Sequence, residues 1–223
     1  MAAWLYGGMD LGPLRLQSRS SLVVDLLLLL QFPLLHSFLL GGKGRRALER
    51  LLPGDLGKRM ISTSFVVAAS LQLMALFIFW APLGGFRWEP SGVVRAAWVA
   101  VYVGAWIFLA IAMWNAGLST QMGYLGWLSV WRGQEPRYGD FPTSGLYRLC
   151  RHPVYFAMAL VAITGPIWTL DHVIVAVVFC AYCVVGPLRK DARYRLRFGD
   201  RFEQYKRATP FFPMLTLTRK AQR

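Results

Sequence analysis

Long apolar runs alternate with short polar and basic segments along this chain. The pattern predicts five membrane-spanning helices, at residues 20–40, 62–80, 96–114, 153–168 and 172–188. A helix rises 1.5 Å per residue, so about 20 residues cross the roughly 30 Å apolar layer of a bilayer. Only three residues separate the last two runs, which predicts a tight antiparallel hairpin. We therefore expect an all-α fold, a multi-pass integral membrane helical bundle of about five helices, forming a single domain over residues 1–223.

Two weaker patterns lie between and after these runs. Residues 119–131 are uncharged but interrupted by glycines, which indicates an interfacial or partly re-entrant segment. From Asp191 to Arg207 the chain is amphipathic, and its rings recur at helical spacing as one stripe: Tyr194, Phe198, Phe202 and Tyr205. We expect an amphipathic helix in a cytoplasmic tail of residues 189–223. It would lie on anionic headgroups or fold back as a lid over Arg151 and His152; the two arrangements are compatible, and the pattern excludes neither.

Composition and charge agree with a membrane protein. The chain is 56% hydrophobic, with a mean hydropathy of +0.41 and a net charge of +14. Of its 25 Lys and Arg residues, 21 fall in residues 41–59, 115–152 and 189–223. The positive-inside rule then places these segments and the C-terminus in the cytoplasm and the N-terminus outside. Because the basic residues sit between apolar runs, we expect membrane lipids and no nucleic acid as partners.

Most other chemistries lack a sequence signal. The three histidines lie in different segments without paired ligand spacing, so no metal site is expected. No glycine-rich nucleotide-binding motif occurs, and charges inside the later runs are too few for a pump or a secondary transporter. In the first run, Asp25 and His36 share a helix face. We expect Asp25 to be an interfacial anchor and keep His36 as a candidate substrate contact.

The most informative segment runs from Gly145 to Tyr155, where a polar loop meets the fourth apolar run. It gathers cations and tyrosines: Tyr147, Arg148, Arg151, His152 and Tyr155. Pro153 suits the first turn of a helix, since its missing N–H would have no partner there, and it biases His152 toward a corner. Such a cluster suits an anionic or zwitterionic ligand. Alternatively, it is a positively charged loop end that only sets topology.

Several motifs resemble a known superfamily. Arg151–Tyr155 (RHPVY), the tight hairpin, and Phe198–Tyr205 (FGxxFxxY) followed by Pro210 and Pro213 are similar to the isoprenylcysteine carboxyl methyltransferase superfamily, which includes phospholipid N-methyltransferases. The N-terminal half resembles the NnrU-type branch, which contains methanethiol S-methyltransferase, in three segments: LLHS at 34–37, STSFV at 62–66 and FWAP at 79–82. The resemblance covers about residues 20–213.

The resemblance implies S-adenosylmethionine (S-adenosyl-L-methionine) as cofactor, bound between the hairpin and the tail helix. By position, the cofactor contacts would be Tyr147, Arg148, Arg151, His152, Pro153, Tyr155, Asp191 and Tyr205. Arg151 and Asp191 would be the catalytic pair; an arginine can hold a carboxylate bidentately, and rings with a carboxylate favour a sulfonium. The superfamily usually has paired glutamates eight and seven residues before the Phe-Gly. Here Lys190 and Asp191 stand at those positions, so one carboxylate is kept and one charge is reversed.

These features together predict a membrane methyltransferase that moves a methyl group from S-adenosylmethionine to a small or lipophilic thiol, such as methanethiol. Within enzymes, the alternative acceptors are an isoprenylated cysteine carboxylate and a phospholipid amine. From a different class, the chain would be a non-catalytic NnrU-like membrane accessory protein, an alternative that Lys190 favours.

Overall fold

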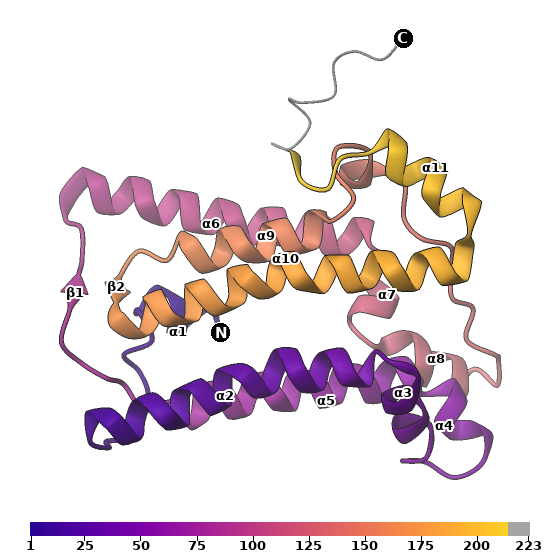
Figure 1. Ribbon diagram of the computed structural model, residues 1–223, viewed down its shortest axis with the longest axis horizontal. Helices are drawn as coiled ribbons and strands as arrows, with labels where there is room; N and C mark the ends of the chain where they lie inside the picture. The colour runs from indigo at the N-terminus through magenta and orange to yellow at the C-terminus, as the bar shows by residue number, and fades with distance from the viewer. Residues whose placement is uncertain (214–223) are drawn as a thin grey trace.

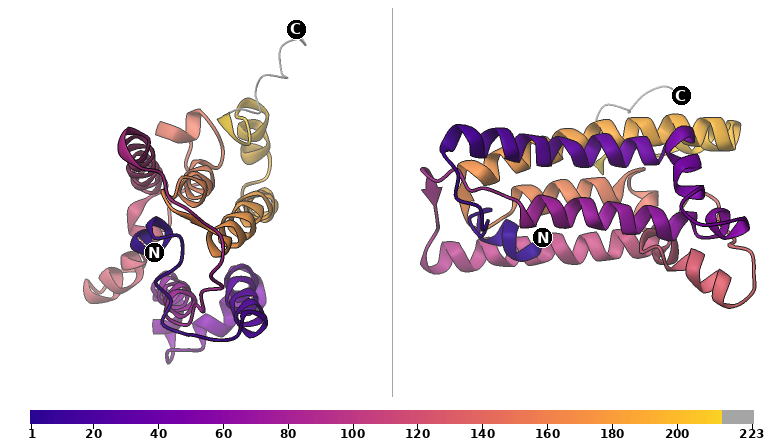
Figure 2. Two further views of the ribbon diagram at one scale, coloured as in Figure 1. Left: turned by 90° about the vertical axis from the view of Figure 1, so that its left-hand side faces the viewer. Right: turned by 90° about the horizontal axis from the view of Figure 1, so that it is seen from below.

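A computed structural model describes residues 1–213 of the protein, so residues 214–223 of the expected tail lie outside the described residues. The chain forms two layers of long helices (Figures 1 and 2). One layer holds α6 (Gly92–Asn115), α9 (Pro153–Ile163) and α10 (Leu170–Phe198), and the other holds α2 (Ser18–Leu39) and α5 (Ile61–Ile78). Helix α9 packs against both α6 and α10, while α2 packs against α5 and α10. The expected all-α architecture is confirmed.

Short elements connect the long helices at the two ends of the bundle (Figure 1). The sheet end carries β1 (Arg87–Trp88) and β2 (Trp168–Thr169), which pair antiparallel, with Arg87 opposite Thr169. The motif end carries the remaining connecting elements: α3 (Gly42–Glu49), α4 (Asp55–Arg59), α7 (Leu118–Gln121), α8 (Tyr124–Trp131), η1 (Gly145–Arg148) and α11 (Asp200–Ala208). A further short helix, α1 (Ala2–Tyr6), packs Leu5 into the core, although the sequence pattern did not predict it.

The chain passes five times between the two ends. Four passes, α2, α5, α6 and α10, are helices long and apolar enough to cross a membrane, with mean hydropathies between 1.9 and 2.1. Large apolar side chains on them, such as Leu27, Val101 and Val177, face outward and are more than half exposed. A helix that is apolar all round requires an apolar surrounding, which for these outward faces is the lipid.

The fourth pass is shorter than predicted. Helix α9 ends at Ile163 rather than near residue 168, because Gly165 and Pro166 follow and a proline disfavours helical backbone in the residue before it. At Gly165 a Cβ would collide with the ring of His172, so only glycine fits. The chain continues to β2, where the Thr169 hydroxyl accepts a 3.1 Å hydrogen bond from the His172 N–H and caps α10. The predicted tight hairpin between the last two passes is confirmed.

The tail helix is also different from the prediction. Helix α10 continues past Leu188 to Phe198, and Gly199 then breaks the chain into a separate helix, α11. Gly199 has φ +54°, a left-handed conformation that glycine adopts without steric cost. The stripe from Tyr194 to Tyr205 is therefore divided between two helices rather than lying along one.

Buried aspartates clasp the sheet end. Asp25 is only 1% exposed and accepts a 2.9 Å hydrogen bond from the Ala81 N–H, so the expected interfacial anchor is in fact buried inside the bundle. Asp171, on α10, accepts hydrogen bonds from the Trp80 indole at 3.0 Å and the Leu83 N–H at 3.1 Å. These bonds satisfy buried backbone and indole donors and hold the segment after α5 between α2 and α10.

Candidate functional site

The motif segment is held at the motif end by the last residue of α6. The side-chain oxygen of Asn115 accepts a 2.8 Å hydrogen bond from the Leu146 N–H, which fixes the start of η1. The preceding Gly145 has φ +58°, and a Cβ there would collide with the Asn115 side chain. After η1 ends at Arg148, Pro153 takes the first position of α9 and is buried. The chain therefore turns a sharp corner at Arg151 and His152, as predicted.

Arg151 and His152 converge on one carboxylate of α10. Asp191 Oδ2 lies 3.4 Å from Arg151 Nη2, and Asp191 Oδ1 lies 2.9 Å from His152 Nε2. Each of the three side chains is at most 10% exposed. Burial lowers the pKa of His152 from 6.5, with Lys190 and Arg151 acting in the same direction and outweighing the raising effect of Asp191. The imidazole is therefore neutral at neutral pH.

Several polar atoms at this corner have no hydrogen-bond partner within residues 1–213. They are Nδ1 and Nε2 of His152, Nε of Arg151 and Oδ1 of Asp191. His152 Nε2 and Asp191 Oδ1 are close, but their alignment does not meet hydrogen-bond geometry. Buried polar groups are nearly always paired, so the gathering of these four atoms on three neighbouring side chains makes the corner a candidate ligand site.

The end of α11 and the residues after it close over the corner; residues 206–212 are called the lid segment below. The Arg151 N–H donates to the Pro210 carbonyl at 2.8 Å, and its Nη1 donates to the carbonyls of Lys206 at 2.9 Å and Thr209 at 3.4 Å. The Phe211 ring lies 5.7 Å from the guanidinium and 4.8 Å, centroid to centroid, from the neighbouring imidazole. The tail thus folds back as a lid over the corner, which is one of the two compatible arrangements predicted for it.

Aromatic packing fixes α11 in this position. Phe141, from the loop before η1, places its ring 5.0–6.1 Å from the rings of the divided stripe, which are Tyr194, Phe198, Phe202 and Tyr205. The Tyr205 hydroxyl also donates a 2.7 Å hydrogen bond to the Tyr147 carbonyl. Tyr205 is thus brought to the corner as predicted, through its bond to η1.

Three tyrosines surround a lysine beside the corner. Lys190 Nζ lies 5.2 Å from the ring centroid of Tyr194 and 6.0 Å from those of Tyr147 and Tyr155. Tyr147 is only 2% exposed, and this burial raises the pKa of its phenol, which stays protonated at neutral pH. We call the three rings the tyrosine cage. The cage adjoins the carboxylate of Asp191, the next residue along α10.

Two predicted site residues lie apart from the corner. Arg148 is exposed, and none of the described contacts joins its side chain to the others. The His36 ring packs against Phe65 at 4.8 Å and reaches Tyr155 only through Tyr182, with centroid separations of 6.1 and 6.5 Å. The cofactor role of Arg148 and the substrate role of His36 remain predictions.

Sequence reasoning missed other residues of the site. Tyr194 was seen only as part of an amphipathic stripe, and Phe211 was not singled out at all. Lys190 stood out by its reversed charge, but nothing local showed that its ammonium points into a cage built by η1 and α9. Phe141 had no signal beyond being an apolar residue in a polar loop.

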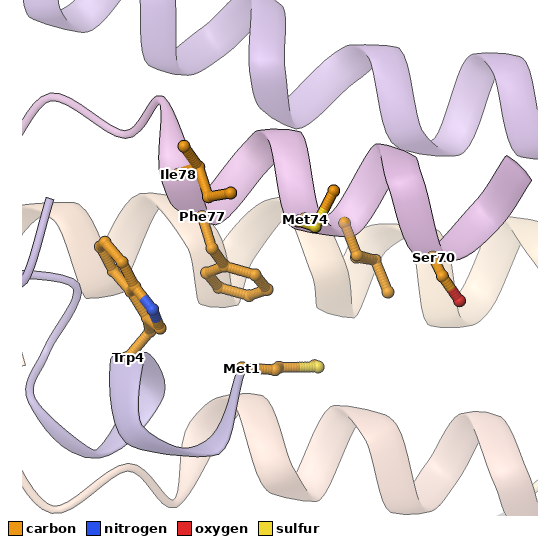
Figure 3. A pocket seen from close by; sticks show the side chains of 7 residues that line it. Met1, Trp4, Ser70, Met74, Phe77 and Ile78 are labelled. Atoms are coloured by element: carbon orange, nitrogen blue, oxygen red, sulfur yellow. The ribbon is translucent and has the colours of Figure 1, made fainter. Parts of the chain in front are cut away.

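An open pocket lies elsewhere, between α1 and α5 (Figure 3), with a volume of about 410 Å³. No acidic, basic or histidine side chain lines it. Its lining is Met1, Trp4, Ser70, Leu73, Met74, Phe77 and Ile78. The Arg151 corner, in contrast, is closed by the lid segment. The residues predicted to carry chemistry therefore gather at the closed corner, away from this open apolar pocket.

Comparison with known proteins supports the resemblance seen in the motifs. The chain matches the NnrU protein family over residues 25–220. It belongs to that family. Methanethiol S-methyltransferase 1 of Bradyrhizobium diazoefficiens is 27% identical over 83% of this chain and 64% of its own length. The methanethiol S-methyltransferase of Crocosphaera subtropica is 26% identical over 86% of this chain and 74% of its own length.

These relatives support a methyltransferase-like function, although the chain spans less than two thirds of the length of the Bradyrhizobium protein. One further relative has a name that does not mention methyl transfer. Cobalt-zinc-cadmium resistance protein CzcN of Cupriavidus metallidurans is 29% identical over 77% of this chain and 72% of its own length. Within residues 1–213 of this chain, no three His, Cys, Asp or Glu side chains are grouped to hold a metal ion. No solved structure matches the chain.

Proposed function

We propose that this protein is a membrane methyltransferase that uses S-adenosylmethionine to methylate a small or lipophilic thiol of the methanethiol class. The observation that carries the proposal is the convergence of four unpaired polar atoms and a tyrosine cage at one closed corner. The methyltransferase relatives supply the reaction class, and their names supply the acceptor class.

The residues at the corner fit this cofactor. S-adenosylmethionine carries a carboxylate, an ammonium and a sulfonium. Arg151 Nε and a ring N–H of His152 are unpaired donors for a carboxylate, and Asp191 Oδ1 is an unpaired acceptor for an ammonium. The faces of Tyr147 and Tyr155 attract a cation. Each charged part of the cofactor thus has a complementary group within one small region.

When bound, S-adenosylmethionine supplies an electrophilic methyl group that a thiolate takes by in-line displacement. The protein contributes positioning and exclusion of water. Arg151 and Asp191 orient the zwitterion, and the lid segment covers it. A thiol needs little base catalysis because its unperturbed pKa is about 8.5 and a nearby cation lowers that value. His152, held neutral by burial, offers one donor and one acceptor at the same place.

Access to this site requires movement of the lid segment. The Nη groups of Arg151 are engaged by Lys206, Thr209 and Asp191, so a bidentate grip on a cofactor carboxylate needs at least the two carbonyls to withdraw. The basic motif end would face the cytoplasm, where the cofactor is made, with the N-terminus outside.

The test is binding of S-adenosylmethionine by the detergent-purified protein, measured by calorimetry. We expect micromolar binding by the wild type, loss of binding in His152→Gln and in Arg151→Ala, and no change in the exposed control Lys43→Ala. Normal binding by both corner variants would show that the cofactor does not bind at this corner. Methyl transfer from labelled cofactor to methanethiol, a prenylcysteine analogue and phosphatidylethanolamine then identifies the acceptor. Methyl transfer to the prenylcysteine analogue alone, or to phosphatidylethanolamine alone, would show that this compound class, and not a small thiol, is the acceptor.

A second candidate function is favoured by Lys190. Its ammonium fills the cage where a sulfonium would lie, as expected for a non-catalytic NnrU-like accessory protein that has kept the scaffold. In that case the folded wild type would neither bind S-adenosylmethionine nor transfer a methyl group to any of the three acceptors.

A further inference from the structure

The tyrosine cage is assembled from three separate parts of the chain. Tyr147 comes from η1, Tyr155 from α9, and Tyr194 lies one turn after Lys190 on α10. All three centroids lie within the roughly 6 Å over which a cation–π attraction acts. Such contacts occur roughly once in 70–80 residues, so three on one ammonium represent a built cation site rather than a chance contact.

The ammonium of Lys190 is a poor match to this site. An ammonium has three N–H donors, and no hydrogen bond or ion pair joins Lys190 to another residue within 1–213. The nearest carboxylate, Asp191, is directed to Arg151 and His152 instead. Because Lys190 meets the cage through its ring faces and none of its phenol oxygens accepts a hydrogen bond from the ammonium within residues 1–213, the cage suits a cation that has no N–H, namely a sulfonium or a quaternary ammonium.

We propose that Tyr147, Tyr155 and Tyr194 form an onium-binding subsite, and that Lys190 is its resident occupant, displaced when a sulfonium ligand enters. This inference rests on the proposed function for the identity of the natural ligand, but the subsite itself stands on the cage geometry. Lys190 is half-buried as a residue, and entry of a sulfonium requires its ammonium to leave the cage.

The same arrangement discriminates between the methyl donor and its demethylated product. When the S–CH₃ bond breaks, its electron pair stays on the cofactor sulfur, which becomes a neutral thioether. The attraction of the three rings for the cofactor is then lost, whereas their attraction for the Lys190 ammonium is unchanged. Lys190 therefore competes better against the demethylated product than against S-adenosylmethionine, which favours product release.

The experiment uses small probes that need no other part of the site. Trimethylsulfonium and its neutral counterpart dimethyl sulfide are titrated into the full-length protein in detergent, with binding followed by saturation-transfer NMR. Lys190→Met keeps the length of the side chain and empties the cage of charge. We expect this variant to bind trimethylsulfonium at least tenfold more tightly than the wild type does, and dimethyl sulfide no better. Adding Tyr194→Leu to Lys190→Met should remove the gain, and Lys43→Met should behave as wild type.

A parallel titration with S-adenosylmethionine distinguishes the subsite from the function. If Lys190→Met gains trimethylsulfonium binding but neither protein binds S-adenosylmethionine, the subsite stands and the proposed cofactor is wrong. If both proteins bind S-adenosylmethionine equally and neither binds trimethylsulfonium, the function stands and the subsite is refuted. Lys190→Gln is the second variant should Lys190→Met not yield folded protein, and the same outcomes apply to it.

Discussion

Replacing Arg151 with lysine should open the lid segment while keeping a positive charge beside Asp191. The guanidinium fork makes three contacts at once: Nη1 reaches the Lys206 carbonyl at 2.9 Å and the Thr209 carbonyl at 3.4 Å, and Nη2 faces the carboxylate at 3.4 Å. The group also lies 5.7 Å from the Phe211 ring. A lysine ammonium is a compact charge that cannot reproduce this fork.

The magnitude follows from the contacts that are lost. A hydrogen bond from a charged group contributes roughly 1.5–3 kcal/mol, and the 2.9 Å bond to Lys206 is the only short one. The Phe211 contact adds about 0.5–1 kcal/mol. If the lysine ammonium keeps its contact with the Asp191 carboxylate but loses those to the lid segment, the closed state is weakened by about 2–4 kcal/mol, or roughly 30- to 1,000-fold in the closing equilibrium. The backbone bond from Arg151 N–H to Pro210 is unaffected.

Hydrogen–deuterium exchange with mass spectrometry measures the closing equilibrium on peptides that cover the lid segment, and their exchange should be faster in Arg151→Lys than in the wild type. Arg148→Lys is the matched control, because Arg148 lies three residues away in the same segment but is exposed. Unchanged exchange in Arg151→Lys would show that aromatic packing on Phe141, rather than the guanidinium, holds the lid segment closed. Equal acceleration in Arg148→Lys would show a general effect of the substitution.

Three further predictions concern stability in detergent. Burial keeps the pKa of His152 below 6.5, so the stability contributed by the neutral imidazole is present above pH 6.5 and is lost as the pH falls toward the lowered pKa. Between pH 7.5 and pH 5 the melting temperature of His152→Gln should therefore fall less than that of the wild type. Equal falls would contradict this. Gly145→Ala should destabilise by about 2 kcal/mol or more through its positive φ and a steric clash, whereas Gly139→Ala, which meets nothing, should be neutral in thermal unfolding. Trp80→Phe removes the indole bond to the Asp171 carboxylate and should cost about 2 kcal/mol; an unchanged melting temperature would mean that this clasp does not stabilise the bundle.

Local rules explain what the sequence predicted well. The apolar runs set the long helices because hydropathy is a property of each segment alone. The corner at Arg151 and His152 followed from Pro153, whose ring restricts the residue before it whatever the rest of the chain does. The third run was predicted to end at residue 114, and α6 ends at Asn115. That Asn115 also anchors η1 was not visible, since the bond crosses to Leu146 in a different segment.

The features that failed or were missed depend on contacts between distant segments. Tyr194 and Tyr205 fit one helical period, so a single helix was predicted, and the left-handed Gly199 between them was not weighed against that period. Lys190 could be recognised as a charge reversal, but its cage is built from η1 and α9. Asp25 was expected at the interface because a lone charge near a helix end usually lies there, yet it lies inside the bundle and accepts a hydrogen bond from the buried N–H of Ala81.

The division of the aromatic stripe decides how α11 can act at the membrane. A helix that binds a bilayer through rings must leave them free to insert among the lipids. Phe202 is only 2% exposed, packed against Phe141, and the Tyr205 hydroxyl is bonded to η1. The rings therefore serve the closed corner and are not available to lipid. What α11 presents outward is charge, including Arg201, so any attraction of the closed state to anionic headgroups is electrostatic and weakens with salt.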